Sequence, residues 1–256
     1  MLSELIILFV AGFFGGMLNS IAGGGSFITF PALLFVGIPP IIANATNTFS
    51  ACAGYMSGAY AFRKDILKDR ENLTKLTLLS LIGGTIGAWL LLQTPEALFM
   101  EAVPWLLLFA SVLFIFGSQL NQQLKEIASG HKRAGQAGAI LLLLLLLCVC
   151  IYGGFFNAGL GIITLSYLAL AGYRDINTMN GIKLLVSSCV SLIAIAVFVM
   201  EGAIDWYSGT IVLTGTLAGG YFAAHYSRKL PQHLVKHFVS VASCCITAYF
   251  FYSIYG

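Results

Sequence analysis

Residues 19–31 read NSIAGGGSFITFP and lie inside an apolar run that extends from position 5 to position 38. A glycine in a helix interior costs about 1 kcal/mol relative to alanine, so Gly23, Gly24 and Gly25 together predict a break in that run. At membrane depth, irregular backbone is tolerated only where protein buries it or where it lines a watery cavity. The stretch is therefore either a joint for close helix packing or the wall of a binding site.

The composition of the chain indicates a membrane protein. Of its 256 residues, 59% are hydrophobic and 9% are charged, whereas a soluble domain has about 25% charged residues. Several apolar runs reach the roughly 20 residues that a helix needs to cross a bilayer. Seven consecutive leucines at 141–147 do not fit the alternating pattern of a membrane β-barrel. We predict an all-α polytopic membrane protein with about 8–10 membrane segments.

The two halves of the chain match at a constant shift of 136 positions, mostly at breaks and at polar positions within apolar runs. The matched pairs are Gly23–Gly159, Gly25–Gly161, Asn44–Asn180, Gly83–Gly219, Gly84–Gly220 and Pro95–Pro231. Internal symmetry of this kind is typical of transporter folds. We predict an N-terminal repeat over 1–120, a cytoplasmic linker over 121–136 and a C-terminal repeat over 137–256. Each repeat would be a broken or re-entrant helical hairpin followed by three transmembrane helices.

The charges of the loops predict that the second repeat is inverted relative to the first. Lysines and arginines gather in 63–75, 121–136 and 228–236, whereas 93–102 and 201–205 carry acids and neither Lys nor Arg. Cytoplasmic loops are enriched in Lys and Arg, so the first three segments should be cytoplasmic. Each over-long apolar run must then return to the side it left, which places both termini on the extracytoplasmic side. One tilted helix in place of either hairpin would contradict this topology.

Polar and glycine residues inside the apolar segments form the predicted site. Half-helices that begin at the two breaks would direct backbone N–H groups and positive dipole ends inward, which suits an anion. We therefore predict a substrate-binding set of Gly23, Gly24, Gly25, Ser26, Asn44, Asn47, Asn157, Gly159, Gly161, Asn180 and Lys183. The alternative role for the glycines is close helix packing. We expect that role for Gly12-x-x-x-Gly16, Gly83-x-x-x-Gly87 and Gly215-x-x-x-Gly219.

Lys183 is the only Lys, Arg, Asp or Glu that falls clearly inside a predicted span. Intramembrane charges are functional candidates, although a lysine near a helix end can also snorkel to the surface. No Asp or Glu lies in the interior of a predicted span, where proton- and sodium-coupled carriers often place one. A lysine with neighbouring amides suits a negatively charged solute.

Sequence signatures of enzymes and metal sites are missing from the chain. It has no His-Glu-x-x-His, Gly-x-Ser-x-Gly or Walker motif, and its six cysteines form no Cys-x-x-Cys pair. The net charge of +3 requires no nucleic-acid partner, because the basic residues cluster in loops. We expect no enzymatic activity, no metal and no cofactor.

Several motifs in a fixed order resemble the TauE/SafE family of membrane permeases. They are GGGSFITFPALL at 23–34 with Gly37, ANATN at 43–47, GGFFNAGLG at 153–161 and GAIDW at 202–206. The resemblance extends over nearly the whole chain, including its length and duplicated halves. It implies a transporter of the bacterial plasma membrane, linked in some members to export of sulfite or sulfur-containing organic anions.

We therefore expect a secondary transporter that exports a small anion by alternating access, with sulfite or an organosulfonate as the leading substrate. An anion channel of the same architecture and a non-transport intramembrane protein are the alternatives. The expected partners are the anionic solute and the lipid bilayer. The leucine run at 141–147 fits a lipid-facing surface and a homo-oligomer interface equally well.

Overall fold

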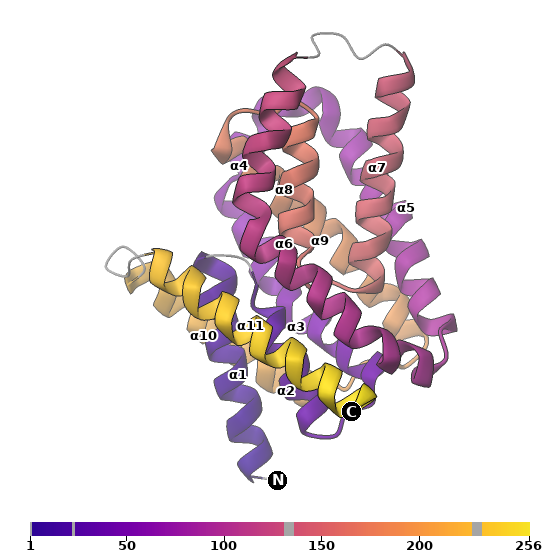
Figure 1. The fold of residues 1–256 in the computed structure, drawn as a ribbon, viewed down its shortest axis with the longest axis vertical. Coiled ribbons are helices and arrows are strands. Elements are labelled where there is room, and N and C mark those ends of the chain that lie inside the picture. The colour runs from indigo at the N-terminus through magenta and orange to yellow at the C-terminus, as the bar shows by residue number, and fades with distance from the viewer. Residues whose placement is uncertain (1, 22–23, 131–135, 227–231) are drawn as a thin grey trace.

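Almost the whole chain is helical in the computed structural model, which describes residues 2–21, 24–130, 136–226 and 232–256 (Figure 1). Those ranges contain no β-strand. Four of their helical stretches are long and apolar enough to cross a membrane, and four shorter apolar helices accompany them. The long ones are Leu2–Asn19, Arg63–Gln93, Glu96–Gly117 and Ile176–Met200. The protein is an all-α polytopic membrane protein, as predicted.

The described residues form α-helices joined by short turns, with one 3₁₀ helix, η1. In chain order the elements are α1 (Leu2–Ile21), α2 (Ser26–Phe35), α3 (Pro40–Ala61), α4 (Arg63–Ile66), η1 (Leu67–Asp69), α5 (Arg70–Gln93), α6 (Glu96–Gly130), α7 (Gln136–Phe155), α8 (Leu160–Leu170), α9 (Ile176–Met200), α10 (Trp206–Tyr226) and α11 (Gln232–Tyr255).

Both over-long apolar runs break at their glycines, and each break separates a long helix from a short one. The first break lies between Ile21 and Ser26, and the second lies between Phe155 and Leu160. Helix α2 has 10 residues and α8 has 11. Such helices are about 15 Å long, half the hydrocarbon thickness of a bilayer. Gly159 turns the chain at the second break with a φ of 81°, a left-handed conformation that favours glycine.

Helix starts repeat at the predicted spacing after the hairpins but not within them. Helices α3 and α9, α5 and α10, and α6 and α11 each begin 136 residues apart. The residue before α2 is Gly25 and the residue before α8 is Gly159, so these two helices begin 134 residues apart. One extra residue in α8 and one in the loop after it restore the spacing. The structure therefore matches Gly25 with Gly159, and the predicted pairs Gly23–Gly159 and Gly25–Gly161 are wrong by two positions.

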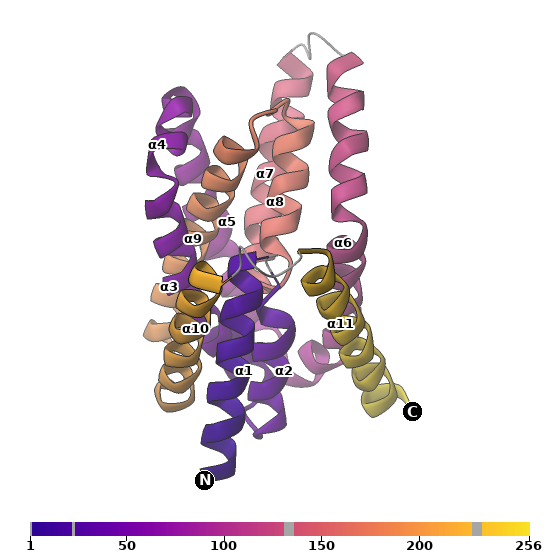
Figure 2. The same ribbon diagram turned by 90° about the vertical axis from the view of Figure 1, so that its left-hand side faces the viewer.

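The two halves of the molecule exchange their first helices. Helix α1 packs along α10 of the second half, and α7 packs along α5 of the first half. Helices α3 and α9 pack against each other, as do α6 and α11. In Figures 1 and 2, α1 rises from the end of the molecule where both termini lie, and α7 descends from the opposite end. The first helix of each half therefore packs mainly against the other half.

Close backbone contact makes this exchange of helices possible. A Cβ atom on Gly16 would lie 2.1 Å from the Thr216 carbonyl oxygen, and one on Gly219 would lie 1.8 Å from a backbone oxygen of α1. On the other side, a Cβ atom on Gly87 would lie 2.1 Å from the Ile151 carbonyl oxygen of α7. No side chain fits at these positions. The predicted packing role of the three Gly-x-x-x-Gly motifs is confirmed.

Two segments predicted as loops are largely helical. The basic segment 63–75 contains α4, η1 and the first turns of α5, and α6 continues to Gly130 through most of the predicted linker. Residues 121–129 contain neither glycine nor proline, so nothing in their sequence ends the helix where its apolar stretch ends. Positions 22–23, 131–135 and 227–231 lie outside the described residues.

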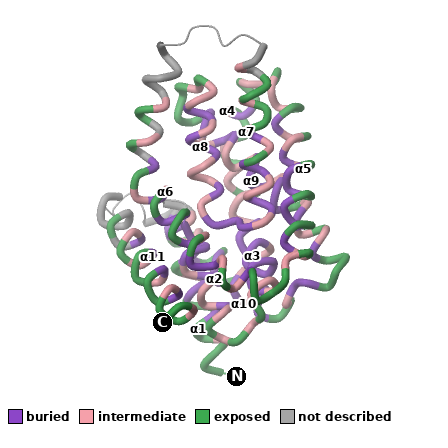
Figure 3. Tube along the Cα trace, turned by 45° about the vertical axis from the view of Figure 1, so that its right-hand side comes forward, coloured by how far each residue is buried: buried purple, intermediate pink, exposed green. Residues whose placement is uncertain are grey.

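Buried positions concentrate where α2, α3, α8 and α9 face the interior, whereas exposed positions follow the outer sides of α5, α6 and α11 (Figure 3). Leu141 and Leu144 of the leucine run are among the exposed apolar residues. An apolar outer surface is expected of helices that contact lipid.

Candidate functional site

One buried amide joins the two central helices. Asn157 lies in the break between α7 and α8, and its Oδ1 accepts a hydrogen bond of 2.8 Å from the Tyr55 hydroxyl of α3. Its Nδ2 donates a hydrogen bond of 3.1 Å to Ser191 Oγ of α9. Tyr55 and Ser191 are 136 positions apart. A single side chain that is 1% exposed therefore bonds to the matching position in both halves.

The predicted asparagines of α3 are buried and bonded within the protein. Asn47 donates from Nδ2 to Ser26 Oγ at 3.1 Å and accepts at Oδ1 from Thr29 Oγ1 at 2.5 Å. Asn44 donates from Nδ2 to the Phe155 carbonyl oxygen at 2.8 Å. That oxygen belongs to the last turn of α7, where carbonyl groups lack partners within the helix. Asn47 thus fastens α3 to α2, and Asn44 fastens α3 to the other half of the molecule.

The matching residues of α9 are arranged differently. Lys183 donates from Nζ to Asn180 Oδ1, one turn earlier on the same helix, at 3.3 Å. The aliphatic part of the lysine lies over α8, since a Cβ atom on Gly161 would be 3.3 Å from Lys183 Cδ. Both α9 residues are half-buried. An ammonium group has three donors, and within the described residues Lys183 uses one of them.

A polar stripe runs from Lys183 toward the central amide. Lys183, Ser187 and Ser191 follow one another at four-residue spacing and so share one face of α9. Ser187 is 1% exposed, and its hydroxyl makes no hydrogen bond to any residue that the structure describes. Buried polar groups normally have partners. The stripe therefore combines an ammonium and a buried hydroxyl that both have unused donors.

The predicted glycines have different surroundings in the structure. A Cβ atom on Gly25 would lie 2.3 Å from the Gly15 carbonyl oxygen of α1, and one on Gly24 would lie 3.1 Å from the Phe114 ring. Gly159 is needed for its left-handed turn. Close packing therefore accounts for Gly24 and Gly25, whereas Gly161 faces the Lys183 side chain. Gly23 lies outside the described residues.

The space beside the predicted site is small. A cavity of about 10 Å³ lies between α1, α2, α3 and α10, and Asn19, Ser26 and Ser50 contribute polar groups to it. That volume accommodates about one water molecule and is too small for a polyatomic anion. This cavity borders Gly25 and Ser26 of the predicted site but not Lys183.

Comparison with known proteins agrees with the transporter-like architecture. The family described as sulfite exporter TauE/SafE matches residues 8–250. The chain belongs to the TauE/SafE family.

Three curated relatives share its length. A probable membrane transporter protein of Haemophilus influenzae is 27% identical over 95% of this chain and 93% of its own length. The probable membrane transporter protein YfcA of Escherichia coli K12 is 25% identical over the whole chain and 93% of its own length. The probable membrane transporter protein ORF9 of Sinorhizobium is 28% identical over 94% of the chain and 90% of its own length. No solved structure matches the chain.

This TauE/SafE member is a multi-pass membrane transporter and not an enzyme, in agreement with both predictions. In the described ranges no three His, Cys, Asp or Glu side chains form a group that could hold a metal ion. The structure also brings residues to the centre that the sequence did not single out. They are Thr29, Tyr55, Ser187 and Ser191. The 136-residue shift pairs Tyr55 with Ser191, so a search for polar residues at matching positions, rather than for identical ones, would have found that pair.

Proposed function

We propose that this protein is a secondary transporter that exports a small anion by alternating access, with sulfite or a sulfur-containing organic anion as the substrate. The observation that carries the proposal is Lys183, which lies within a membrane-length helix and bonds through only one of its donors to the residues that the structure describes. Buried Ser187 on the same stripe adds a second unused donor. A half-buried cation with unused hydrogen-bond donors is suited to an oxyanion, since charge-assisted bonds to anions are the stronger ones.

The proposed mechanism uses two inverted repeats that rock against each other around the Asn157 bridge. Support comes from the reciprocal packing of α1 with α10 and of α7 with α5, and from the opposite directions of α1 and α7 (Figure 1). A membrane potential that is negative inside favours outward movement of an anion, so the proposal requires no coupling carboxylate.

The proposed orientation places the α4 end of the molecule in the cytoplasm of the cell and both termini outside it. Arg63, Lys64, Lys68 and Arg174 lie in or beside α4 and the α8–α9 loop, and Lys-rich segments are enriched on the cytoplasmic side. Both termini lie at the other end (Figure 1). Thiol-reactive labelling of a cysteine added at either terminus, in a chain without its native cysteines, should occur from outside. Labelling from the cytoplasmic side alone would contradict this orientation.

Flux measurements in proteoliposomes test the function. Sulfite, sulfate, thiosulfate and sulfoacetate would be compared with a carboxylate control, and the flux should saturate with substrate. Lys183→Met should lower flux by about tenfold to a hundredfold, the loss expected for a hydrogen bond to a charged group. The matched control is Lys68→Met, which removes an exposed lysine that pairs with Asp65 and Asp175 and should leave flux unchanged. Equal flux in Lys183→Met and wild type would remove the lysine from the site.

A further inference from the structure

The two ends of the molecule carry matching acidic and polar residues at the starts of matching helices. Asp69 precedes α5 and Asp205 precedes α10, each as the residue before the first helical position. Asn72 and Ser208 each follow three positions later, so both pairs are separated by 136 residues. Each pair faces the loop that leads from a half-length helix to a central helix.

At the basic end, a tyrosine occupies the space in front of this pair. The Tyr173 hydroxyl donates a short hydrogen bond to Asp69 Oδ2, and Asn72 Nδ2 donates to the same hydroxyl at 3.4 Å. Tyr173 belongs to the loop between α8 and α9. Asp69 and Asn72 therefore both form hydrogen bonds with the hydroxyl of an aromatic ring.

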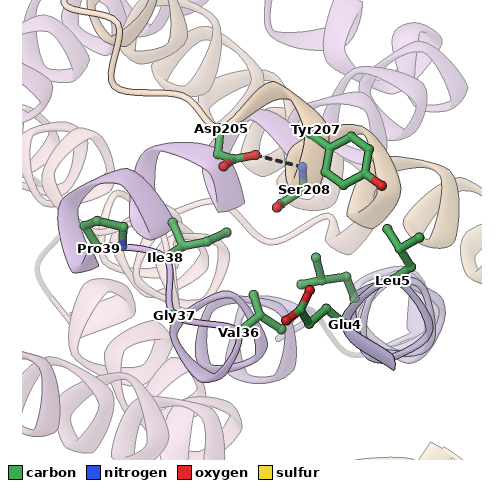
Figure 4. A pocket seen from close by; sticks show the side chains of 10 residues that line it. Glu4, Leu5, Val36, Gly37, Ile38, Pro39, Asp205, Tyr207 and Ser208 are labelled. Atoms are coloured by element: carbon green, nitrogen blue, oxygen red, sulfur yellow. Dashed lines mark hydrogen bonds between the residues drawn. The ribbon is translucent and has the colours of Figure 1, made fainter. Parts of the chain in front are cut away.

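At the acidic end, the corresponding loop has no such ring. The Ile38 backbone N–H donates to the Leu33 carbonyl oxygen, just as that of Tyr173 donates to the Leu168 carbonyl oxygen. Ile38 is thus the counterpart of Tyr173, and its side chain has no hydroxyl. A cavity of about 260 Å³ lies in front of Asp205 at this place, and we call it the Asp205 cavity. Its lining residues are Glu4, Leu5, Leu8, Val36, Gly37, Ile38, Pro39, Asp205, Tyr207 and Ser208 (Figure 4).

The Asp205 cavity contains polar groups without partners among the described residues. Asp205 Oδ1 accepts from the Ser208 backbone N–H at 2.8 Å, which leaves Oδ2 unused. The Ser208 residue is 8% exposed, and its hydroxyl, directed into the cavity in Figure 4, makes no hydrogen bond to the described part of the chain. A buried hydroxyl without a partner is costly to leave unpaired.

We propose that the Asp205 cavity binds a small primary ammonium ligand, with its N–H donors directed to Asp205 Oδ2 and Ser208 Oγ. The Tyr173 ring at the other end indicates the size and the donor chemistry that this arrangement accepts. The Asp205 carboxylate and the lack of Lys or Arg among the lining residues favour a cation over a neutral alcohol. A free amine and the ethanolamine headgroup of a lipid both carry this group. The site is separate from Lys183 and does not depend on the proposed anion transport.

Calorimetric titration of the full chain in phosphatidylcholine nanodiscs tests the proposal, with benzylammonium as the ligand and benzyl alcohol as its neutral counterpart. Benzylammonium should bind wild type at least about tenfold more tightly than benzyl alcohol. Ile38→Tyr places a ring where Tyr173 lies at the other end, so it should fill the cavity and abolish binding. Ile38→Leu is the size-matched control and should bind as wild type does. Added phosphatidylethanolamine should compete if the headgroup is the natural occupant.

Two further variants decide the outcome even if Ile38→Tyr does not fold. Ser208→Ala and Asp205→Asn should each weaken benzylammonium binding about tenfold, and asparagine retains the capping acceptor of α10. No binding to wild type would overturn the proposal. Equal binding of the alcohol and the ammonium, or full binding to both variants, would also overturn it.

Discussion

Helices α3 and α9 begin at matching positions of the two halves, yet they use their polar side chains differently. Asn44 and Asn47 of α3 bond to α7 and α2, whereas Asn180 and Lys183 of α9 bond to each other. The α3 residues are fully buried and the α9 residues are half-buried. Matching positions thus connect α3 to other helices in the first half, whereas in the second half they hold a lysine with donors that no described residue uses. Helices that start at the same spacing therefore differ in the chemistry of their side chains.

Removing the bridge between the two helices should give the largest loss of stability. Asn157→Leu leaves the Tyr55 and Ser191 hydroxyls buried without their partner, which should cost about 2 kcal/mol of unfolding free energy. Thermal or denaturant unfolding in detergent would measure it. Tyr55→Phe in the same chain should recover part of the loss, because it removes one of the two stranded groups. Strict additivity of the two changes would show that the bond contributes nothing.

Alanine substitutions of the asparagines in α3 and α9 should have different effects on stability. Asn47→Ala removes one bond of Ser26 and one bond of Thr29, so it should lower the unfolding free energy by about 1 kcal/mol. Asn180→Ala removes one long bond to Lys183 and should stay within about 0.5 kcal/mol of wild type. The same unfolding assay compares the two. A larger loss of unfolding free energy in Asn180→Ala than in Asn47→Ala would show that Asn180, and not Asn47, holds its helix to the rest of the protein.

Alanine substitutions of the two serines in the α9 stripe, Ser187 and Ser191, should also differ in their effect on stability, by a smaller amount. Ser191→Ala removes a bond to Asn157 and should cost about 0.5 kcal/mol. Ser187→Ala removes a buried hydroxyl without a described partner and should be neutral or slightly stabilising. The same change should weaken apparent substrate affinity in the flux assay. Loss of stability without any change in flux would make Ser187 a structural residue.

The smallest expected effect is a pH dependence of stability that comes from the N-terminal cap of α9 and is missing from α3. Asp175 caps α9, and the Thr178 hydroxyl, followed by the Asn177 backbone N–H, lowers the pKa of its carboxyl below the ordinary value of 3.8. A depressed pKa means that the capping stabilisation is present above pH 3.8 and is lost as the pH falls through the lower, folded-state pKa. Helix α3 begins with Pro39 and Pro40 and has no ionisable cap.

Thermal unfolding between neutral pH and about pH 3 would measure this contribution. Asp175→Asn, which caps without titrating, should show a shallower loss of melting temperature over the acid range than wild type. Identical slopes for the two proteins would show that the Asp175 carboxyl contributes nothing to the acid sensitivity.

The sequence predicts the fold class, the two breaks and the close-packed glycines because each follows from a local rule. Three consecutive glycines in an apolar run, or glycines at four-residue spacing, have few alternatives. Helix α6 extended beyond its predicted end because polar residues with good helix propensity continue a helix outside an apolar stretch. The glycine pairs predicted at the two breaks were wrong by two positions. A single shift of 136 for the whole chain cannot reveal that α8 and the loop after it each contain one more residue than α2 and its loop.

The site was predicted in outline but not in its bonding. Asn157, Asn47 and Lys183 were identified from their type and place in apolar runs. Their partners could not be, since Tyr55, Ser191 and Thr29 are common on helix faces and only the packing of α2, α3 and α9 selects them. Glycine is suited both to a binding site made of backbone and to close helix packing, so the residue type of Gly24 and Gly25 does not distinguish the two roles. Only the short distances from Gly25 to Gly15 and from Gly24 to Phe114 show that packing applies.

The pairing of α1 with α10 has a consequence for how the protein is made. Helix α1 leaves the ribosome long before its close-packed partner, which begins at Trp206. At typical synthesis rates that partner appears on the order of ten seconds or more later. During that interval the glycine face of α1 has no native helix to contact. A fragment that stops after the first repeat should therefore insert but remain open to wrong helix partners and to degradation, and the supply of α10 as a separate chain should rescue it.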